Sequence, residues 1–140
     1  MPTDAVTVAA AIRAANNSDD VEKARAMFSA LLDAILVVQT AEAVAPGGGP
    51  HVLTEDTPMR MATMTGPGGE RALPTFTDAD ALRRWHPDAE HQVGLEAPDL
   101  FGKAIEWGFD VVLVNHADED WIQLRDELLR TLADGRVPAL

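Results

Sequence analysis

One segment of the sequence, from Arg71 to Trp85, constrains the fold more than any other. A short apolar stretch, Ala72 to Phe76, runs directly into Thr77, whose hydroxyl is suited to accept the free amide hydrogens at a helix start. Acidic residues then occupy the first turn of the expected helix and two arginines its last turn, which suits the helix dipole. The segment therefore predicts a strand that leads into a helix capped by Thr77.

Continuous apolar runs predict further strands. The run 34–39 is rich in β-branched residues and follows a helical pattern, with the change from helix to strand near Asp33. Its unbroken apolar character is typical of a strand that is covered on both faces. Residues 110–115 form the clearest buried strand in the sequence, and a short extended piece is predicted at 91–95.

Residue spacing predicts helices around these strands. Residues 5–15 form an apolar helical pattern. Ala5, Ala9 and Ile12 are predicted to lie on one side of this helix, with Val8 nearby. A second helix starts after a cap at Ser18 or Asp19. Pro98 suits the first turn of a later helix, which is expected to end at Gly108.

Glycine-rich segments predict the connections. The segment 66–69 separates two extended runs, 59–65 and 70–76, and this arrangement predicts a β-hairpin. The segment 45–50 contains three consecutive glycines, but neither a helical pattern nor a Lys-Ser/Thr pair follows it. A phosphate loop needs both, so this segment is interpreted as a flexible connector.

The segment 118–124 is compatible with two structures. It can begin one long helix from Asp118, or residues 121–124 can pair back as a strand, with a helix starting near Arg125. Periodicity does not separate one helical turn from four residues of strand. In either case helices and strands alternate, which predicts an α+β (α/β-like) fold with a single mixed β-sheet of about five or six strands packed with helices. We expect residues 1–140 to form a single domain.

Charge and composition exclude several functions. The chain has 23 Asp plus Glu against 11 Lys plus Arg, a net charge of −12. Such a surface repels phosphate backbones and anionic lipids, so we expect no nucleic-acid or membrane binding, and a partner that is basic. The lack of cysteine excludes a disulfide framework, a thiolate zinc site and a cysteine nucleophile. No secretory signal or membrane-spanning apolar run is visible, so the expected location is cytoplasmic.

Several segments carry a family resemblance. The main one is Leu73-Pro74-Thr75-Phe76-Thr77, and the supporting ones are 28–33, 81–82, Trp85 and 104–115. Together they resemble the N-terminal domain of SseB-type proteins, a family frequent in actinobacteria and also found in enterobacteria. The resemblance covers roughly residues 19–133.

This resemblance implies a fold and no chemistry. It favours the hairpin for the segment 118–124, because relatives commonly place a turn and a short strand there. The family name comes from an enterobacterial protein associated with serine sensitivity, which does not define a biochemical activity. The resemblance therefore implies no catalytic residue and no cofactor.

Two groups of polar residues are candidates for binding a divalent cation. His86, Asp88 and His91 offer imidazole and carboxylate ligands within one short segment, although a proline between them prevents a regular helical ligand face. His116 and Asp118 follow the predicted buried strand, at the edge where open α/β sheets bind ligands. The five residues define a metal-site hypothesis.

Tryptophan and arginine are residue types that anchor protein interfaces. Trp85 has Arg83 and Arg84 beside it, and Trp121 follows an acidic turn. These four residues are the predicted interaction site.

The sequence leaves two function hypotheses. The favoured one is a non-catalytic interaction or regulatory module that binds an unknown protein partner, with a homodimer as a further hypothesis because an uncovered sheet edge invites pairing. The alternative is a small-molecule or divalent-metal binding protein that uses the loops 86–91 and 116–120. Neither hypothesis requires an enzyme or a cofactor.

Overall fold

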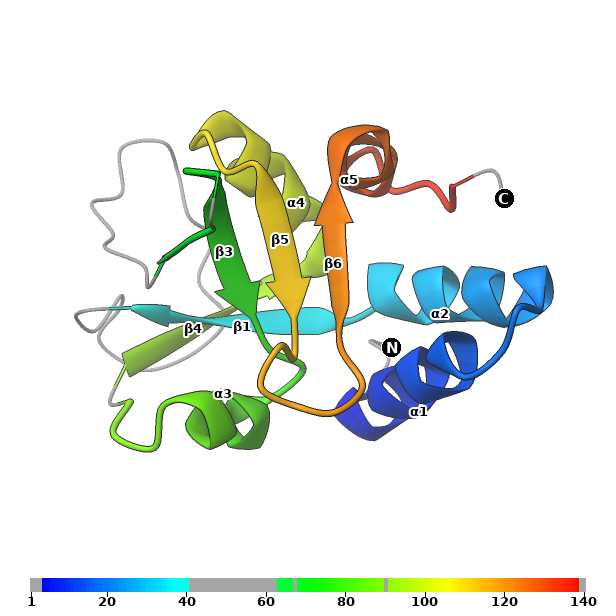
Figure 1. The fold of residues 1–140 in the computed structure, drawn as a ribbon, viewed down its shortest axis with the longest axis horizontal. Coiled ribbons are helices and arrows are strands. Elements are labelled where there is room, and N and C mark those ends of the chain that lie inside the picture. The colour runs from blue at the N-terminus through cyan, green and yellow to red at the C-terminus, as the bar shows by residue number, and fades with distance from the viewer. Residues whose placement is uncertain (1–3, 41–62, 67, 90, 139–140) are drawn as a thin grey trace.

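The computed structural model describes residues 4–40, 63–66, 68–89 and 91–138. The predicted connector 45–50, together with most of the run 59–65, lies outside these residues. The elements follow one another along the chain as in Figure 1. They are α1 (Ala5–Asn16), α2 (Val21–Leu32), β1 (Ile35–Thr40), β2 (Met64–Thr65), β3 (Arg71–Thr75), α3 (Ala79–Trp85), β4 (His91–Glu96), α4 (Ala97–Glu106), β5 (Val111–Val114), β6 (Ile122–Arg125) and α5 (Asp126–Ala133).

The described strands form two sheets, so the expected α+β class is confirmed and the expected single sheet is wrong. The larger sheet has the order β2-β3-β5-β6, with β3 and β5 parallel and the other neighbours antiparallel. The smaller sheet pairs β1 with β4. β1 crosses behind the larger sheet (Figure 1), and an isolated bridge joins its Val37 to Phe76, the residue that follows β3.

The ambiguous segment after β5 forms a hairpin. β6 runs antiparallel to β5, with Val114 opposite Ile122 and Val111 opposite Arg125. α5 then begins at Asp126. The hairpin interpretation is therefore confirmed and the single long helix is wrong. The earlier predicted hairpin is also confirmed for its described residues, because β2 and β3 pair antiparallel.

β1 is covered mainly on one face, which differs from the expectation of a strand buried on both. Leu36 and Val38 are fully buried, whereas Ile35 remains 36% exposed. A Cβ atom on Gly94 of β4 would lie 3.0 Å from Cγ2 of Ile35, so glycine at this position leaves the space that Ile35 occupies. In this apolar run, Leu36 and Val38 pack in the core, whereas Ile35 packs against Gly94 of the neighbouring strand.

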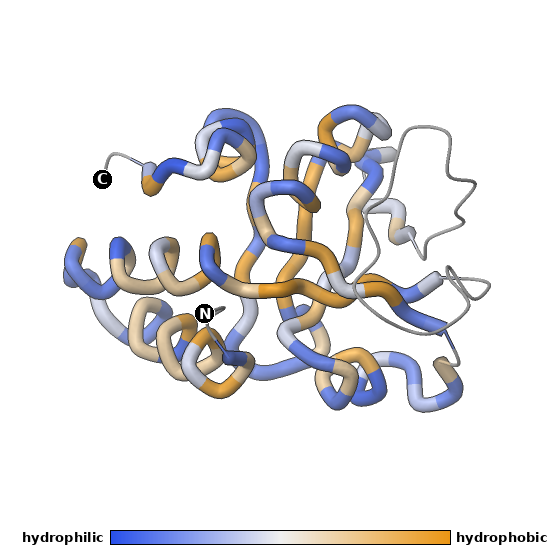
Figure 2. Tube along the Cα trace, turned by 180° about the vertical axis from the view of Figure 1, so that it is seen from behind, coloured by the Kyte–Doolittle hydropathy of each residue, from blue (hydrophilic) through white to orange (hydrophobic). Residues whose placement is uncertain are grey.

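One main core holds most of the described elements together, and α3 packs in a second, smaller cluster with Phe76. α1 packs against α2, and α4 packs against α5. Fully buried side chains come from both helical pairs and both sheets; they include Ile12, Leu31, Leu36, Leu73, Phe101, Val112 and Leu132. Figure 2 shows the strands as the most hydrophobic part of the chain trace, at the centre of the molecule. Among the described helices, none combines the length and apolar character that crossing a membrane requires.

Two glycines in or next to α4 differ in backbone conformation, and replacing each by alanine tests the effect of that difference on stability. Gly108 follows α4 with a φ of +81°, and a Cβ atom there would lie 3.4 Å from an Arg71 guanidinium nitrogen. Gly102 lies inside α4 with no heavy atom within 4 Å of an added Cβ. We expect Gly108→Ala to lower the free energy of unfolding by about 1–2 kcal/mol. Gly102→Ala should raise it by roughly 0.5–1 kcal/mol. Urea unfolding followed by tryptophan fluorescence tests this, and effects of the same sign would contradict it.

Candidate functional site

The candidate site lies where the two parallel strands β3 and β5 end. The carboxyl ends of parallel strands meet at one edge of a sheet, and this edge is a common place for ligand binding. In this chain Thr75 and Val114 are paired at that edge. The chain then continues from β3 into α3 and from β5 into the loop 115–120.

A reciprocal pair of hydrogen bonds joins these two continuations. The Thr77 backbone N–H donates to Oδ1 of Asn115 at 3.0 Å, and the Asn115 side-chain amide donates to the Thr77 hydroxyl at 3.1 Å. Asn115 is 2% exposed and has a φ of 55°, a conformation that asparagine adopts more readily than most residues. The pair fixes the direction in which both segments leave the sheet.

This pair also explains why the predicted helix cap is wrong. Because Thr77 is bonded to Asn115, it does not cap α3. Asp78 takes that place, and its carboxylate accepts the Ala81 N–H at 2.8 Å. A strand leading into a helix was predicted correctly, but the cap lies one residue later.

An open groove, which we call the α1 groove, lies between α1 and the loop 115–120. Its cavity volume is ≈ 780 Å³. The α1 side of the groove consists of Val6, Ala9, Ala10, Arg13 and Ala14. The opposite side consists of Arg84, Asn115 and residues 117–120. The groove thus has a helix with small apolar side chains on one side and a polar loop on the other.

The α1 side of the groove is an apolar surface exposed to solvent. Val8 and Ile12 face the core with 0% exposure, whereas Val6 is 79% exposed. Ala9 is also exposed. α1 is therefore apolar on both its buried and its exposed sides, which is unusual for a helix that only covers a core.

One ion pair links the two sides of the groove, and a second lies within the side opposite α1. Both carboxylates belong to the loop 115–120. Asp120 accepts a hydrogen bond from Nε of Arg13 at 3.1 Å. Asp118 accepts two from Arg84, at 2.7 and 2.8 Å, which is the strong bidentate arrangement. The hydrogen bonds that Arg84 donates to Asp118 raise the pKa of Arg84 above its ordinary value, so this guanidinium stays charged.

His116 lies behind the groove in an aromatic cluster. Its ring centroid is 5.1 Å from that of Trp85 and 5.8 Å from that of Phe76, and the rings of Phe76 and Trp85 stack at 5.7 Å. Both ring nitrogens of His116 are shielded from solvent without a hydrogen-bond partner. Burial lowers the pKa of His116 below its ordinary 6.5, and the nearby Asp118 carboxylate opposes this shift.

The lowered pKa of His116 predicts a loss of stability in acid. A histidine whose pKa is lower in the folded protein binds its proton more tightly in the unfolded chain. The free energy of unfolding of the wild type minus that of His116→Phe should therefore be constant above about pH 7.5. This difference should decrease as the pH falls below 6.5, because the unfolded wild-type chain takes up a proton at His116 more readily than the folded protein. Urea unfolding of both proteins from pH 5 to pH 8 tests this, since contributions of the other groups cancel in the difference. A difference that does not change with pH would contradict it.

The structure unites two sets of residues that the sequence predicted separately. Arg84 and Trp85 came from the interaction set, and His116 and Asp118 from the metal set. Arg84 bonds to Asp118, and Trp85 packs on His116. His116 and Asp118 belong to the loop 115–120, and Arg84 and Trp85 of α3 contact it through them.

The other predicted interaction residues lie outside the groove walls. Arg83 is exposed and pairs with Asp80 along α3, with 3.4 Å between the charged atoms. Trp121 is 43% exposed, and its carbonyl accepts a hydrogen bond from the Asn16 side chain at the end of α1. Trp121 therefore lies beside the groove, where Asp120 joins it to the loop.

The remaining predicted metal ligands belong to no group that could hold a metal ion among the described residues. His86 follows α3, with Nδ1 3.0 Å from Oε1 of Gln39. Asp88 is exposed in the next turn, and His91 opens β4. Within the described ranges there is no group of three or more His, Asp or Glu side chains that could hold a metal ion. The structure therefore gives the metal hypothesis no ligand set in this part of the chain.

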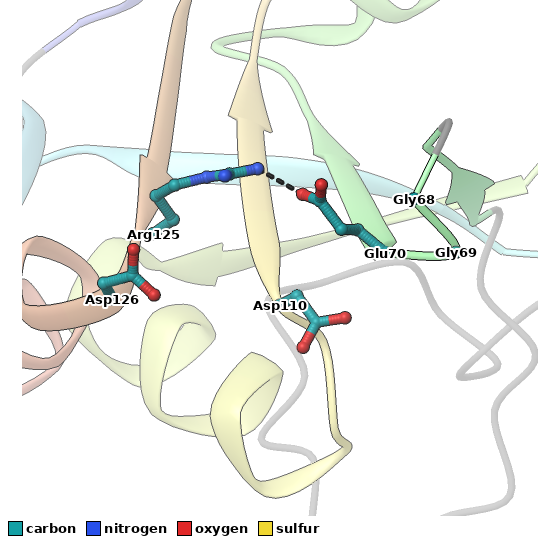
Figure 3. Close-up of a pocket in the computed structure, with 6 residues that line it drawn as sticks. All are labelled: Gly68, Gly69, Glu70, Asp110, Arg125 and Asp126. Carbon is teal, nitrogen blue, oxygen red and sulfur yellow. Dashed lines mark hydrogen bonds and ion pairs between the residues drawn. The ribbon is translucent and has the colours of Figure 1, made fainter.

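A second, smaller pocket lies at the opposite end of β5, with a volume of ≈ 310 Å³ (Figure 3). Arg125 of β6 reaches across β5 to form an ion pair with Glu70. Asp110 accepts the Arg71 backbone N–H at 3.0 Å. These contacts hold the start of β3 against β5 and β6, which is a structural role.

Sequence reasoning missed the α1 side of the groove. Alanine is a strong helix former and occurs on both buried and exposed surfaces, so its presence in α1 did not indicate a binding face. A detectable signal was the absence of a polar side on this helix, in which Arg13 is the one charged residue between Ala5 and Asn16.

The fold is an α+β module with an open groove at the carboxyl end of a parallel strand pair. The family model described as SseB protein N-terminal domain matches residues 8–131. The chain therefore belongs to the SseB N-terminal domain family, which confirms the resemblance and extends it into α1. Comparisons with curated proteins and with solved structures gave no match.

Proposed function

We propose that this chain is a non-catalytic interaction module that binds a protein partner in the α1 groove. The observation that carries the proposal is the exposed apolar side of α1, formed by Val6 and three alanines, opposite a loop whose conformation is fixed. Exposed apolar surface of this kind is characteristic of interaction sites. Burying it against a partner would release water from Val6 and the alanine methyl groups.

The polar groups of the groove support binding better than catalysis. Arg13 and Arg84 are paired with carboxylates, and Asn115 is bonded to Thr77. Among the described residues that form the groove walls there is no serine, threonine or histidine. His116, the histidine of this loop, packs against aromatic rings and is not part of the groove walls. This arrangement supplies contacts for a partner and no nucleophile with a base.

The charge of the chain supports a basic partner. Ten of the 11 lysines and arginines lie in the described residues, and eight of these ten pair with a carboxylate. Because the carboxylates outnumber the cations, the surplus negative charge remains available to a partner. Two copies of a chain with a net charge of −12 repel each other, which disfavours a homodimer at low salt. A cytoplasmic location is part of the same proposal.

Affinity capture with matched variants tests the proposed function. Wild type, Val6→Glu and Val21→Glu are immobilised and exposed to a lysate of the native host, and the captured proteins are quantified by mass spectrometry. Val6 belongs to the groove, whereas Val21 is a 43% exposed valine at the start of α2. We expect a defined partner whose recovery falls about tenfold or more with Val6→Glu, because burying the new carboxylate costs well over 1 kcal/mol.

The control variant should retain the partner, since Val21 lies outside the groove walls. Recovery of no partner above background, or equal recovery with both variants, would contradict the proposal. The ligand hypothesis is tested in parallel by thermal unfolding with Mg²⁺, Zn²⁺ and free amino acids. Binding to the folded state raises the melting temperature, so a reproducible rise would favour the small-molecule or metal alternative instead.

A further inference from the structure

The two ion pairs of the α1 groove are asymmetric in exposure. The side chains of Asp118 and Asp120 are 23% and 20% exposed, whereas those of Arg84 and Arg13 are 54% and 72% exposed. The carboxylates are therefore held by the loop, and the guanidinium groups approach them from solvent. The backbone fixes the loop in turn, because the Asp118 N–H donates to the Asn115 carbonyl at 2.9 Å.

The two guanidinium groups differ in how firmly they are held. Arg84 donates two hydrogen bonds to Asp118. Arg13 donates one to Asp120, from Nε. A singly bonded, largely exposed ion pair contributes little to stability, so another cation can replace Arg13 at small cost. The carboxylate of Asp120 would then remain in place for the incoming group.

We propose that the α1 groove receives a basic segment of the partner protein, whose lysine or arginine replaces Arg13 on Asp120. This inference rests on the proposed function and specifies its partner. The apolar side chains of the segment lie on Val6 and the alanines of α1, and Glu119, which is exposed beside Asp120, adds a second attraction. Arg13 is thus an internal competitor for the cation subsite.

Charge complementarity favours this occupant over other classes. The loop offers three consecutive carboxylates, of which Asp118 stays neutralised by Arg84. Once Arg13 is displaced, Asp120 and Glu119 face the groove without an internal cation. An acidic peptide or a second copy of this acidic chain would meet the same charges with repulsion.

A peptide titration tests the inference. The probe is a short synthetic peptide in which leucine and lysine alternate, and its counterparts carry glutamine or glutamate in place of lysine. The ¹⁵N-labelled full chain is titrated with each peptide at low salt. We expect the lysine peptide to shift the amide signals of Ala10, Ala117 and Glu119, with an affinity that falls as salt is added. The glutamate peptide should leave these signals unchanged.

The decisive measurement compares two variants that change the net charge equally. Arg13→Gln removes the proposed competitor, and Arg130→Gln removes a similarly exposed arginine that pairs with Glu127 on α5, with side-chain exposures of 72% and 68%. We expect Arg13→Gln to bind the lysine peptide roughly twofold to fivefold more tightly than wild type, in line with the strength of an exposed ion pair. Arg130→Gln should bind like wild type. In an Asp120→Asn background, the Arg13→Gln substitution should have no further effect.

Each outcome decides the inference. Tighter binding by Arg13→Gln alone, lost in the Asp120→Asn background, supports it. Weaker binding, equal effects of both arginine variants, signal shifts outside the groove, or no binding at millimolar peptide would overturn it. If the inference fails while lysate capture still depends on Val6, the groove binds a partner of different chemistry and the proposed function stands. If no partner is captured either, both fail.

Discussion

The pair of hydrogen bonds between Asn115 and Thr77 is the interaction on which the candidate site depends. It joins the ends of two parallel strands that lie 38 residues apart in the sequence at these positions. Because Asn115 is 2% exposed, removing its bonds to Thr77 would leave buried polar atoms of the amide without a partner. The pair sets where α3 begins and where the loop 115–120 starts. The position of Asp118 and Asp120 opposite α1 follows from that geometry.

Elements dominated by one local requirement could be predicted from the sequence. The apolar run of β5 and the glycine after α4 are examples, since Gly108 adopts the positive φ that ends the helix. The helix cap was wrong because local chemistry suits Thr77 and Asp78 almost equally. The choice is made by Asn115, which is remote in sequence and takes up Thr77. The number of sheets was wrong for a related reason, because strand pattern does not show that β1 crosses the larger sheet.

The candidate site was predicted in pieces. Titratable and aromatic residues attract attention in a sequence, and this reasoning found Arg84, Trp85, His116 and Asp118. Their assignment to two different functions was a consequence of sequence distance, since α3 and the loop 115–120 meet only after β3 and β5 pair. The helix α1 was missed because alanine occurs on both buried and exposed surfaces and does not indicate a site. Its exposed apolar side is recognisable as one wall of a groove only in the structure, where the acidic loop 115–120 lies opposite it.

The acidity of the chain affects which proteins can reach the apolar groove. An exposed apolar surface invites non-specific contacts, and a net charge of −12 repels most acidic proteins before they reach it. At short range, Arg13 would also discriminate between partners, because it forms a weak, solvent-exposed ion pair with Asp120 that a partner must replace. A neutral apolar segment cannot replace that cation, whereas a basic segment can. In the proposed complex, apolar burial would supply affinity and charge exchange would supply specificity, with no reactive group required for either.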